Sequence, residues 1–216
     1  MAKLYKRMII MVLLGVFIIN SATVTYGLSD TDVQRDVNGL ADIAINEFKL
    51  RAEIHPHKAV DELEDEINQK VEEIIGQVNC DLTFETICYK GDTTLIAELS
   101  GKGELDYEKI IEVQKNFKKN LSQMNVDAEY SLCVKSKILN NTMEEIKEGI
   151  IDYLTVNKAQ NTEVTMINNG YSIMSTLGME NKKVVLGKNI DFSCAIVKYS
   201  SGCYLLLGTP EITITY

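Results

Sequence analysis

The order of hydrophobic patterns constrains the fold of this chain most strongly, because one succession of strand, helix and hairpin occurs twice. In the first occurrence, residues 48–55 alternate between apolar and polar side chains, which is typical of a strand with one buried face. Residues 57–78 then carry apolar side chains at helical spacing, opposite a strongly acidic face. The stretches 81–89 and 93–100 alternate again on either side of Gly91, which predicts a hairpin.

The second occurrence begins with the alternating residues 128–135. Thr142 and Glu145 have the spacing of a capping box, so we expect a helix to begin there. Residues 163–177 follow as a second hairpin, whose turn at Asn169-Gly170 is the strongest short-range turn signal in the chain.

Further elements surround these two units. Ser29 is placed to cap a short helix before the first strand, and Asp106 to cap a helix between the two occurrences. A turn at Ser201-Gly202 joins two more alternating stretches. Apolar and polar residues also alternate in 211–216, which predicts a last strand that completes the sheet.

Together these patterns predict an α+β fold, in which a duplicated strand-helix-hairpin unit forms a mainly antiparallel sheet with helices on one face. We expect a short helical lead-in at residues 28–46 and one domain at 47–216, with halves at 47–127 and 128–216.

The turn positions also predict which residues face each other across the hairpins. With Gly91-Asp92 as the first loop, Cys88 lies opposite Leu95 and inside the core. Asn169-Gly170 and Ser201-Gly202 fix the other two hairpins in the same way.

The N-terminal residues have the composition of an export signal. Basic residues Lys3, Lys6 and Arg7 precede the apolar run 8–19, and small or polar residues follow it at 20–22. The domain is therefore expected outside the cytoplasm. Residues 1–27 are either a signal peptide that is cleaved to release a secreted protein, or an anchor that holds the domain at the cell membrane.

The charge of the chain argues against partners that carry phosphate. Without Lys3, Lys6 and Arg7, 19 of the 22 basic residues remain against 31 acidic ones, a net charge near -12. Such a body repels polyanions, so we expect no nucleic-acid partner, and membrane contact only through the N-terminal segment if it is uncleaved.

The cysteines suggest structure rather than chemistry. Their number is odd, and their spacing contains neither a CxxC motif nor a metal-ligand pattern. Small buried side chains in strands are the simplest interpretation, although one disulfide stays open. With Ser201-Gly202 as a loop, Cys194 lies opposite Thr209 and Cys203 opposite Ser200, so these two cysteines are not cross-strand partners.

No catalytic motif stands out. His55 and His57 are the only histidines, and strand-end polar residues are a simpler interpretation of them than two ligands of a metal. The acidic residues of the 57–78 helix have the pattern of a solvated face. We therefore name no catalytic, cofactor-binding or metal-binding residue and expect no cofactor.

The C-terminal part resembles a known family. The stretches NNGYSIM (168–174) and NIDFSCAIVKYSSGCYLLLGTP (189–210), with EITITY (211–216), are similar to the YwmB-like family of spore-forming Gram-positive bacteria, which is catalogued under a TATA-box-binding name. Glu211 stands where that family usually has an apolar residue. The resemblance implies a TATA-box-binding-protein-like α+β fold in an exported protein linked to the cell envelope or sporulation. It implies no catalytic residue.

These observations favour a non-enzymatic binding or adaptor protein whose partner is an envelope protein or a wall component. The expected contact surface is the sheet face without helices, where Arg51, Glu85, Glu98 and Thr213 converge in the predicted pairing. The alternative is an envelope-acting hydrolase with an unrecognised carboxylate site, in which two acids face each other across a cleft.

Overall fold

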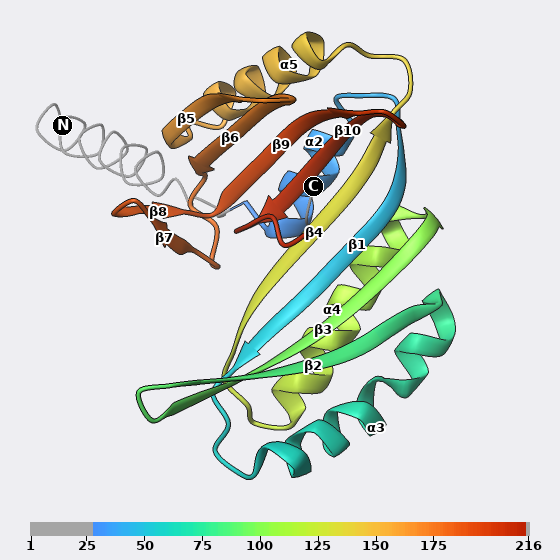
Figure 1. The fold of residues 1–216 in the computed structure, drawn as a ribbon, viewed down its shortest axis with the longest axis vertical. Helices are drawn as coiled ribbons and strands as arrows, with labels where there is room; N and C mark the ends of the chain where they lie inside the picture. The colour runs from blue at the N-terminus through green and yellow to red at the C-terminus, as the bar shows by residue number, and fades with distance from the viewer. Residues whose placement is uncertain (1–27, 215–216) are drawn as a thin grey trace, which may run out of the picture.

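The computed structural model describes residues 28–214, which form one eight-stranded sheet with helices on one side (Figure 1). The strand order is β2-β3-β1-β4-β10-β9-β6-β5, and β7 and β8 form a separate two-stranded sheet. All the pairings are antiparallel. The predicted α+β class, antiparallel sheet and one-sided helices are confirmed. The predicted export segment, residues 1–27, and residues 215–216 lie outside the described residues.

Apart from the β7–β8 hairpin and the last predicted strand, the elements follow the predicted order. The helices are α2 (Asp30–Asn38), α3 (Val60–Val78), α4 (Tyr107–Gln123) and α5 (Met143–Val156). The strands are β1 (Ile43–Ile54), β2 (Cys80–Tyr89), β3 (Asp92–Leu105), β4 (Ala128–Ile138), β5 (Gln160–Ile167), β6 (Gly170–Thr176), β7 (Lys183–Val185), β8 (Lys188–Ile190), β9 (Phe192–Tyr199) and β10 (Gly202–Thr209). β1 therefore begins inside the segment predicted as a helical lead-in.

The predicted helix caps form. The side chains of Ser29 and Asp106 accept hydrogen bonds from backbone N–H groups in the first turns of α2 and α4. Thr142 and Glu145 form the predicted capping box of α5. α3 starts later than predicted, because Ala59 is still extended and caps the helix without a side-chain hydrogen bond.

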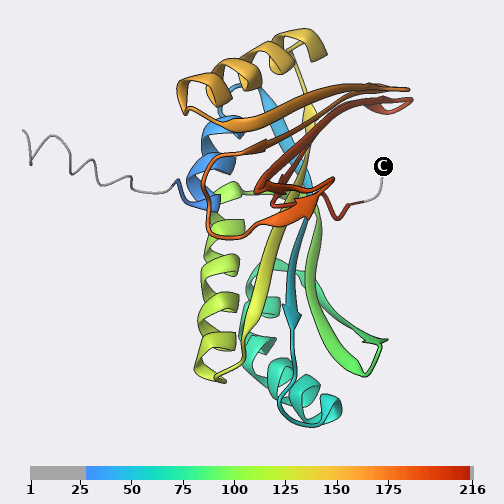
Figure 2. The ribbon, with the colours of Figure 1, turned by 90° about the vertical axis from the view of Figure 1, so that its left-hand side faces the viewer.

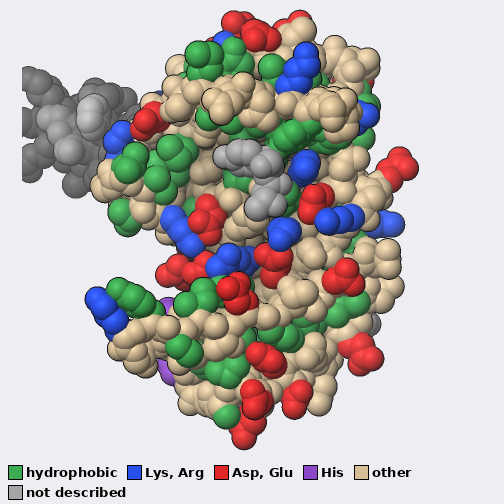
Figure 3. Space-filling view, viewed as in Figure 1, with side chains coloured by type: hydrophobic (Ala, Val, Ile, Leu, Met, Phe, Trp, Pro, Cys, Tyr) green, Lys and Arg blue, Asp and Glu red, His purple; other side chains and the backbone are tan. Residues whose placement is uncertain are grey.

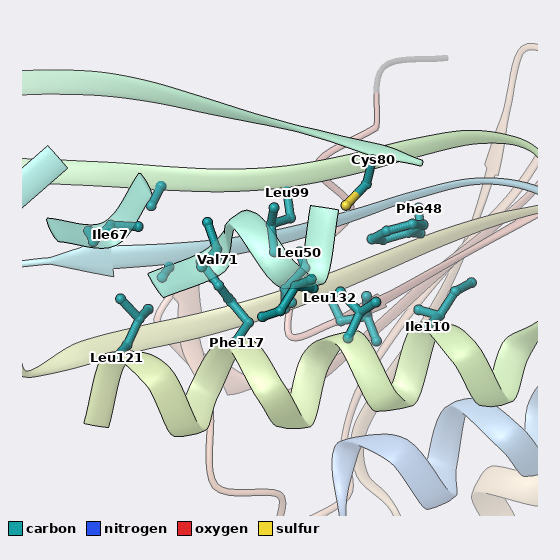
Figure 4. Close-up of a cluster of buried hydrophobic side chains, with 14 of the residues drawn as sticks. Phe48, Leu50, Ile67, Val71, Cys80, Leu99, Ile110, Phe117, Leu121 and Leu132 are labelled. Atoms are coloured by element: carbon teal, nitrogen blue, oxygen red, sulfur yellow. The ribbon is translucent and has the colours of Figure 1, made fainter. Parts of the chain in front are cut away.

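The helices bury one face of the sheet in two hydrophobic clusters. α3 and α4 cover the first half, where Leu50 of β1 lies beside Val71 of α3 and Phe117 of α4 (Figure 4). Phe48 of β1 belongs to the same cluster and lies nearer Ile110 of α4. α2 and α5 cover the second half in the same way. The predicted buried face of β1, residues Phe48, Leu50, Ala52 and Ile54, is fully buried.

The duplicated order of elements is present, but the two halves do not place their hairpins alike. β1 and β4 pair at the centre of the sheet, each at the start of one unit. In the first half the β2–β3 hairpin lies directly beside β1, whereas in the second half the β9–β10 hairpin lies between β4 and the β5–β6 hairpin.

Each hairpin turn lies one residue earlier in the chain than predicted. The loops are Lys90-Gly91, Asn168-Asn169 and Ser200-Ser201, so cross-strand partners shift by two residues and each strand keeps its predicted faces. Cys88 consequently pairs with Thr93 instead of Leu95, next to the hairpin tip and beyond the helices. The prediction that Cys88 is buried in the core is wrong, because its side chain is exposed.

The second turn was misplaced because its glycine serves packing. A Cβ on Gly170 would lie 1.8 Å from the carbonyl oxygen of Ile196, so glycine is needed where β6 runs against β9. In the third hairpin, Cys194 faces Leu207 and Cys203 faces Lys198, so these two cysteines are still not cross-strand partners.

The predicted last strand is wrong for residues 211–214, which do not pair in the sheet. After β10 the chain folds back over the sheet face opposite the helices. Ile214 is buried there in a third cluster, against Cys133, Ala195, Val197 and Leu206. Ile212 packs beside it, so the alternation arises because both side chains face the sheet surface.

Within residues 28–214, none of the helices combines the length and the apolar character that crossing a membrane requires.

Candidate interaction face

We call the side of the eight-stranded sheet opposite the helices the open face. Figure 2 shows the sheet curving so that the β2–β3 hairpin at one end and the β5–β6 and β9–β10 hairpins at the other bend toward this side. Figure 3 shows acidic and basic side chains gathered in a band across its middle. The open face is therefore a concave surface with charged residues near its centre.

Arg51 and Glu98, two of the predicted interaction residues, lie directly opposite each other on β1 and β3. Their closest ionic contacts are with other residues. Glu98 forms an ion pair with Lys49 at 2.8 Å, and Arg51 Nε lies 3.4 Å from Glu53. The second contact lies outside hydrogen-bond geometry, so Arg51 Nε is buried without a hydrogen-bond acceptor.

The other two predicted residues reach the open face from different elements. Glu85 is exposed on the edge strand β2, opposite Ile96. Thr213 belongs to the C-terminal segment and contacts Cys133 of β4. Burial raises the pKa of the Cys133 thiol to about 11, and hydrogen bonds with the backbone of Ile214 and Thr213 offset part of that effect. The structure thus makes only Arg51 and Glu98 direct neighbours in register.

Lys183 is the functional candidate that the sequence did not reveal. Its ammonium group lies 2.8 Å from Glu53 of β1 and 2.8 Å from Glu211 of the C-terminal segment. Burial lowers the pKa of Lys183, but the hydrogen bonds and charges of Glu211 and Glu53 together raise it above its ordinary value. Lys183 therefore holds three segments together that are far apart in the sequence.

A pocket of about 180 Å³ opens beside Lys183. Figure 3 shows a hollow at the left between the two projecting hairpins, with side chains of both charges on its floor. Glu53 and Glu129 face each other across β1 and β4 at this pocket. Its lining residues are Glu53, Glu129, Tyr130, Ser131, Glu180, Asn181, Lys182, Lys183 and Pro210. The pocket therefore offers both carboxylates and ammonium groups to a ligand.

The other candidates for chemistry stay dispersed. His55 and His57 are both exposed at the end of β1. In the part of the chain that the structure describes, there is no group of three or more His, Cys, Asp or Glu side chains that could hold a metal ion. The cysteines are all free: Cys80, Cys133 and Cys194 are buried, Cys203 is half-buried and Cys88 is exposed.

The acidic helix face also matches its simplest interpretation. Glu62 and Asp65 are exposed on α3, and Glu66 forms an ion pair with Lys58. α3 packs on the covered side of the sheet, so these carboxylates do not contribute to the open face.

No protein-family model and no curated protein matches the chain. Among solved structures, it is similar to the de novo designed protein Foldit4, with 14% identity and a TM-score of 0.32 over 41% of this chain and 94% of that one. It is also similar to the ligand-free regulatory subunit of aspartate kinase from Thermus thermophilus, with 8% identity and a TM-score of 0.26 over 78% of this chain and 85% of that one. Similarities this low indicate neither a fold family nor a function.

Proposed function

We propose that this protein is a non-enzymatic, extracytoplasmic binding or adaptor protein of the YwmB-like family, and that its open face binds an envelope protein during cell-envelope or sporulation processes. The observation that carries the proposal is the charge pairing on that face. Lys49 is paired with Glu98, Arg51 with Glu53, and Lys183 with both Glu53 and Glu211.

Paired charges favour a protein partner over a polyanion. A nucleic acid is held by cations that exchange counterions for phosphates, and here each of these three cations already has a carboxylate partner. A surface that carries both acidic and basic side chains instead complements a protein surface of mixed charge, and the arrangement of the charges makes the contact specific. A TATA-box-binding-protein-like fold is supported by the concave sheet alone, so in this proposal the name describes shape and not DNA binding.

Location outside the cytoplasm is supported by the sequence of the N-terminal segment. Residues 8–19 are apolar and follow three basic residues, which is the arrangement that export machinery reads. An adaptor at the envelope could be either secreted or anchored there, and both outcomes leave the open face accessible.

Site-specific photocross-linking tests the proposed face. A photoreactive amino acid at Glu85, which is exposed on the open side of β2, should cross-link one envelope protein. The matched control is the same amino acid at Glu62, exposed on α3 at the other side of the sheet. Equal cross-linking at both positions, or none at Glu85 in intact cells, would overturn the proposal.

The hydrolase alternative has one observation in its favour, namely the facing carboxylates of Glu53 and Glu129 at the pocket. If they act on the wall, the purified protein should release soluble fragments from cell-wall material, and Glu129→Gln should abolish the release. If the wall material stays undigested and Glu85 gives a specific cross-link, the adaptor function is supported and the hydrolase is excluded.

A further inference from the structure

The β7–β8 hairpin carries an apolar tip that no other part of the described chain covers. Val184 is 74% exposed and Leu186 is 86% exposed. Figure 1 shows the hairpin projecting from the body of the molecule at the left. Single exposed apolar residues are ordinary on a protein surface, and Val156 and Met166 are others in this chain, but two on one projecting tip form a candidate contact surface.

Turn chemistry does not explain the leucine. Leu186 and Gly187 have φ angles of 50° and 77°, the left-handed conformation of a two-residue hairpin turn. Asn, Asp and Gly suit the first of these positions, and a bulky side chain is unfavourable there. The other non-glycine residues at left-handed positions among residues 28–214 are polar, namely Asn79, Lys90, Asn125, Lys158 and Asn161, so Leu186 is the one apolar residue in this group. An apolar residue at 186 therefore suggests a requirement other than turn stability.

The root of the hairpin is held firmly. Asn181 donates a hydrogen bond to Asp30 at 2.9 Å, and Lys183 bridges Glu53 and Glu211. The buried carboxylate of Asp191 accepts hydrogen bonds from three successive backbone N–H groups, those of residues 177–179. These contacts fix the base of the β7–β8 hairpin to the rest of the domain.

The hairpin root also adjoins the point where the apolar N-terminal segment joins the domain. Leu28 lies in the same pocket wall as Gly178 and Glu180, the residues that lead into the hairpin. Twenty residues before Leu28 begins the apolar run 8–19. If that run enters a bilayer, the hairpin lies near the bilayer surface.

One lysine beside the tip is available to a phospholipid headgroup, although the net charge of the chain is -9. Residues 181–190 contain three lysines and no acid, but Lys183 is paired with Glu53 and Glu211, and Lys188 with Glu163. Lys182, unlike Lys183, has no carboxylate partner among residues 28–214. The acidic helix α3 lies at the bottom of Figure 1, away from the hairpin. Glu53, Glu129 and Glu180 line the pocket at the hairpin root, so lipid contact would be confined to the tip.

We propose that the β7–β8 hairpin is a lipid-contact element of the membrane-anchored form of this protein. Val184 and Leu186 enter the boundary between headgroups and acyl chains, and Lys182 lies at the level of the headgroup phosphates. Two apolar side chains bind a bilayer only weakly, but the N-terminal segment keeps the tip at a high effective concentration near the surface. A protein pocket is the less favoured partner, because a bilayer that holds residues 8–19 would also lie close to this hairpin. This proposal does not depend on the partner of the open face.

The absence of tryptophan from the chain allows a direct test. The full chain with Leu186→Trp is inserted through its N-terminal segment into phosphatidylcholine–phosphatidylglycerol vesicles, with and without brominated acyl chains. We expect a blue-shifted emission that the brominated lipids reduce by about twofold or more. The control is Leu139→Trp, because Leu139 is 51% exposed and directly follows β4. The C-terminal end of β4 lies at the top right of Figure 1, away from the β7–β8 hairpin.

A second reporter separates lipid contact from misfolding. Val184→Trp should be quenched like Leu186→Trp, and adding Leu186→Asn should reduce the quenching while preserving the turn, since asparagine suits its left-handed position. Emission at 184 and 186 that brominated lipids leave unchanged would overturn the proposal, as would equal quenching of Leu139→Trp. A blue shift that requires added protein and not lipid would assign the tip to a protein pocket instead.

Discussion

A Cβ atom on Gly208 would lie 2.2 Å from the carbonyl carbon of Glu211, so the C-terminal segment folds back onto β10 in direct backbone contact. The next residue, Thr209, is anchored on the other side, where its Oγ1 accepts a hydrogen bond from Gln34 at 2.9 Å. The Gly-Thr-Pro sequence at 208–210 is therefore a fold-back, and it delivers Ile214 to its place on the open face.

Gly208→Ala should displace this segment, because backbone atoms at 2.2 Å cannot move aside without breaking the fold-back. We expect a loss of about 1–3 kcal/mol in the free energy of unfolding and faster proteolysis after residue 209. Urea unfolding and limited proteolysis measure the two effects. The control is Gly76→Ala, since nothing lies within 4 Å of that Cβ on α3 and helix propensity makes it neutral or stabilising. Equal stability of the two variants would contradict the fold-back.

Ile214→Ala should destabilise the protein by about 2–4 kcal/mol without abolishing the fold, because Ile214 is only 3% exposed but lies outside the sheet pairing. A strand within the sheet would instead be required for folding, as the sequence alone suggested. Chemical denaturation with circular dichroism checks this. Ile87→Ala on the exposed side of β2 is the control, and its cost should be below about 1 kcal/mol. An unfolded Ile214→Ala protein would show that the segment is an integral strand.

Much of the fold could be predicted because local patterns and tertiary packing agree. The alternation in β1 favours a strand with one buried face, and the sheet has that strand. Helix starts are likewise favoured, and found, at the capping residues Ser29, Asp106 and Thr142. The faces of the hairpin strands were also predictable, since a shift of two residues in pairing leaves every side chain on its original face.

The remaining features depend on contacts between distant segments. Glycine at position 170 looks like a turn residue, yet its place is set by the approach of Ile196 from β9. The partners of Lys183 lie 130 residues before it and in the C-terminal segment, so no local pattern indicates them. Arg51 and Glu98 therefore lie opposite each other on the open face, while their role in binding stays a prediction, and Lys183 was missed.

Lys183 and Glu211 should show energetic coupling in a double-mutant cycle. Lys183→Ala, Glu211→Ala and the double variant should give a coupling of about 0.5–1 kcal/mol at low salt, because the pair at 2.8 Å is about two-thirds shielded from solvent. Thermal or urea unfolding measures it, and added salt should reduce it. The Lys188–Glu163 pair is longer, at 3.4 Å, and more exposed, so its coupling should be smaller. A coupling equal to that of the control pair would contradict the proposal that Lys183 links the C-terminal segment to β7.

The native protein should expose one fast-reacting thiol. Cys88 is exposed, Cys203 is half-buried, and Cys80, Cys133 and Cys194 are buried, so a thiol reagent should modify Cys88 first and Cys203 more slowly. Denaturation should raise the titre to all 5 cysteines. Cys88→Ser should remove the fast phase alone. Fewer thiols in the denatured, unreduced protein would indicate a disulfide.

Stability should fall as the pH rises above about 9, because the folded protein keeps protons that the unfolded chain releases. Burial raises the pKa of the Cys133 thiol from its ordinary value of 9.0 to about 11, and burial also raises the pKa of Cys194. Below pH 9 both states bind the proton and the full stability is present. Between about pH 9 and pH 11 only the folded state binds it, so Cys133 alone removes about 2–3 kcal/mol across that range.

Urea unfolding between neutral and alkaline pH measures this slope. Cys133→Ala should make the slope shallower by the Cys133 contribution, while the Cys194 contribution remains, and should lower stability at neutral pH through the cavity that it leaves. Ile87→Ala, which removes no ionisable group, should leave the slope unchanged. Burial and the charge of Asp36 also raise the pKa of the partly buried Tyr153 to about 12, so a smaller loss should continue above pH 10 in both variants. An unchanged slope in Cys133→Ala would mean that the C-terminal segment does not seal this thiol from water, which would contradict the placement of Ile214 over β4.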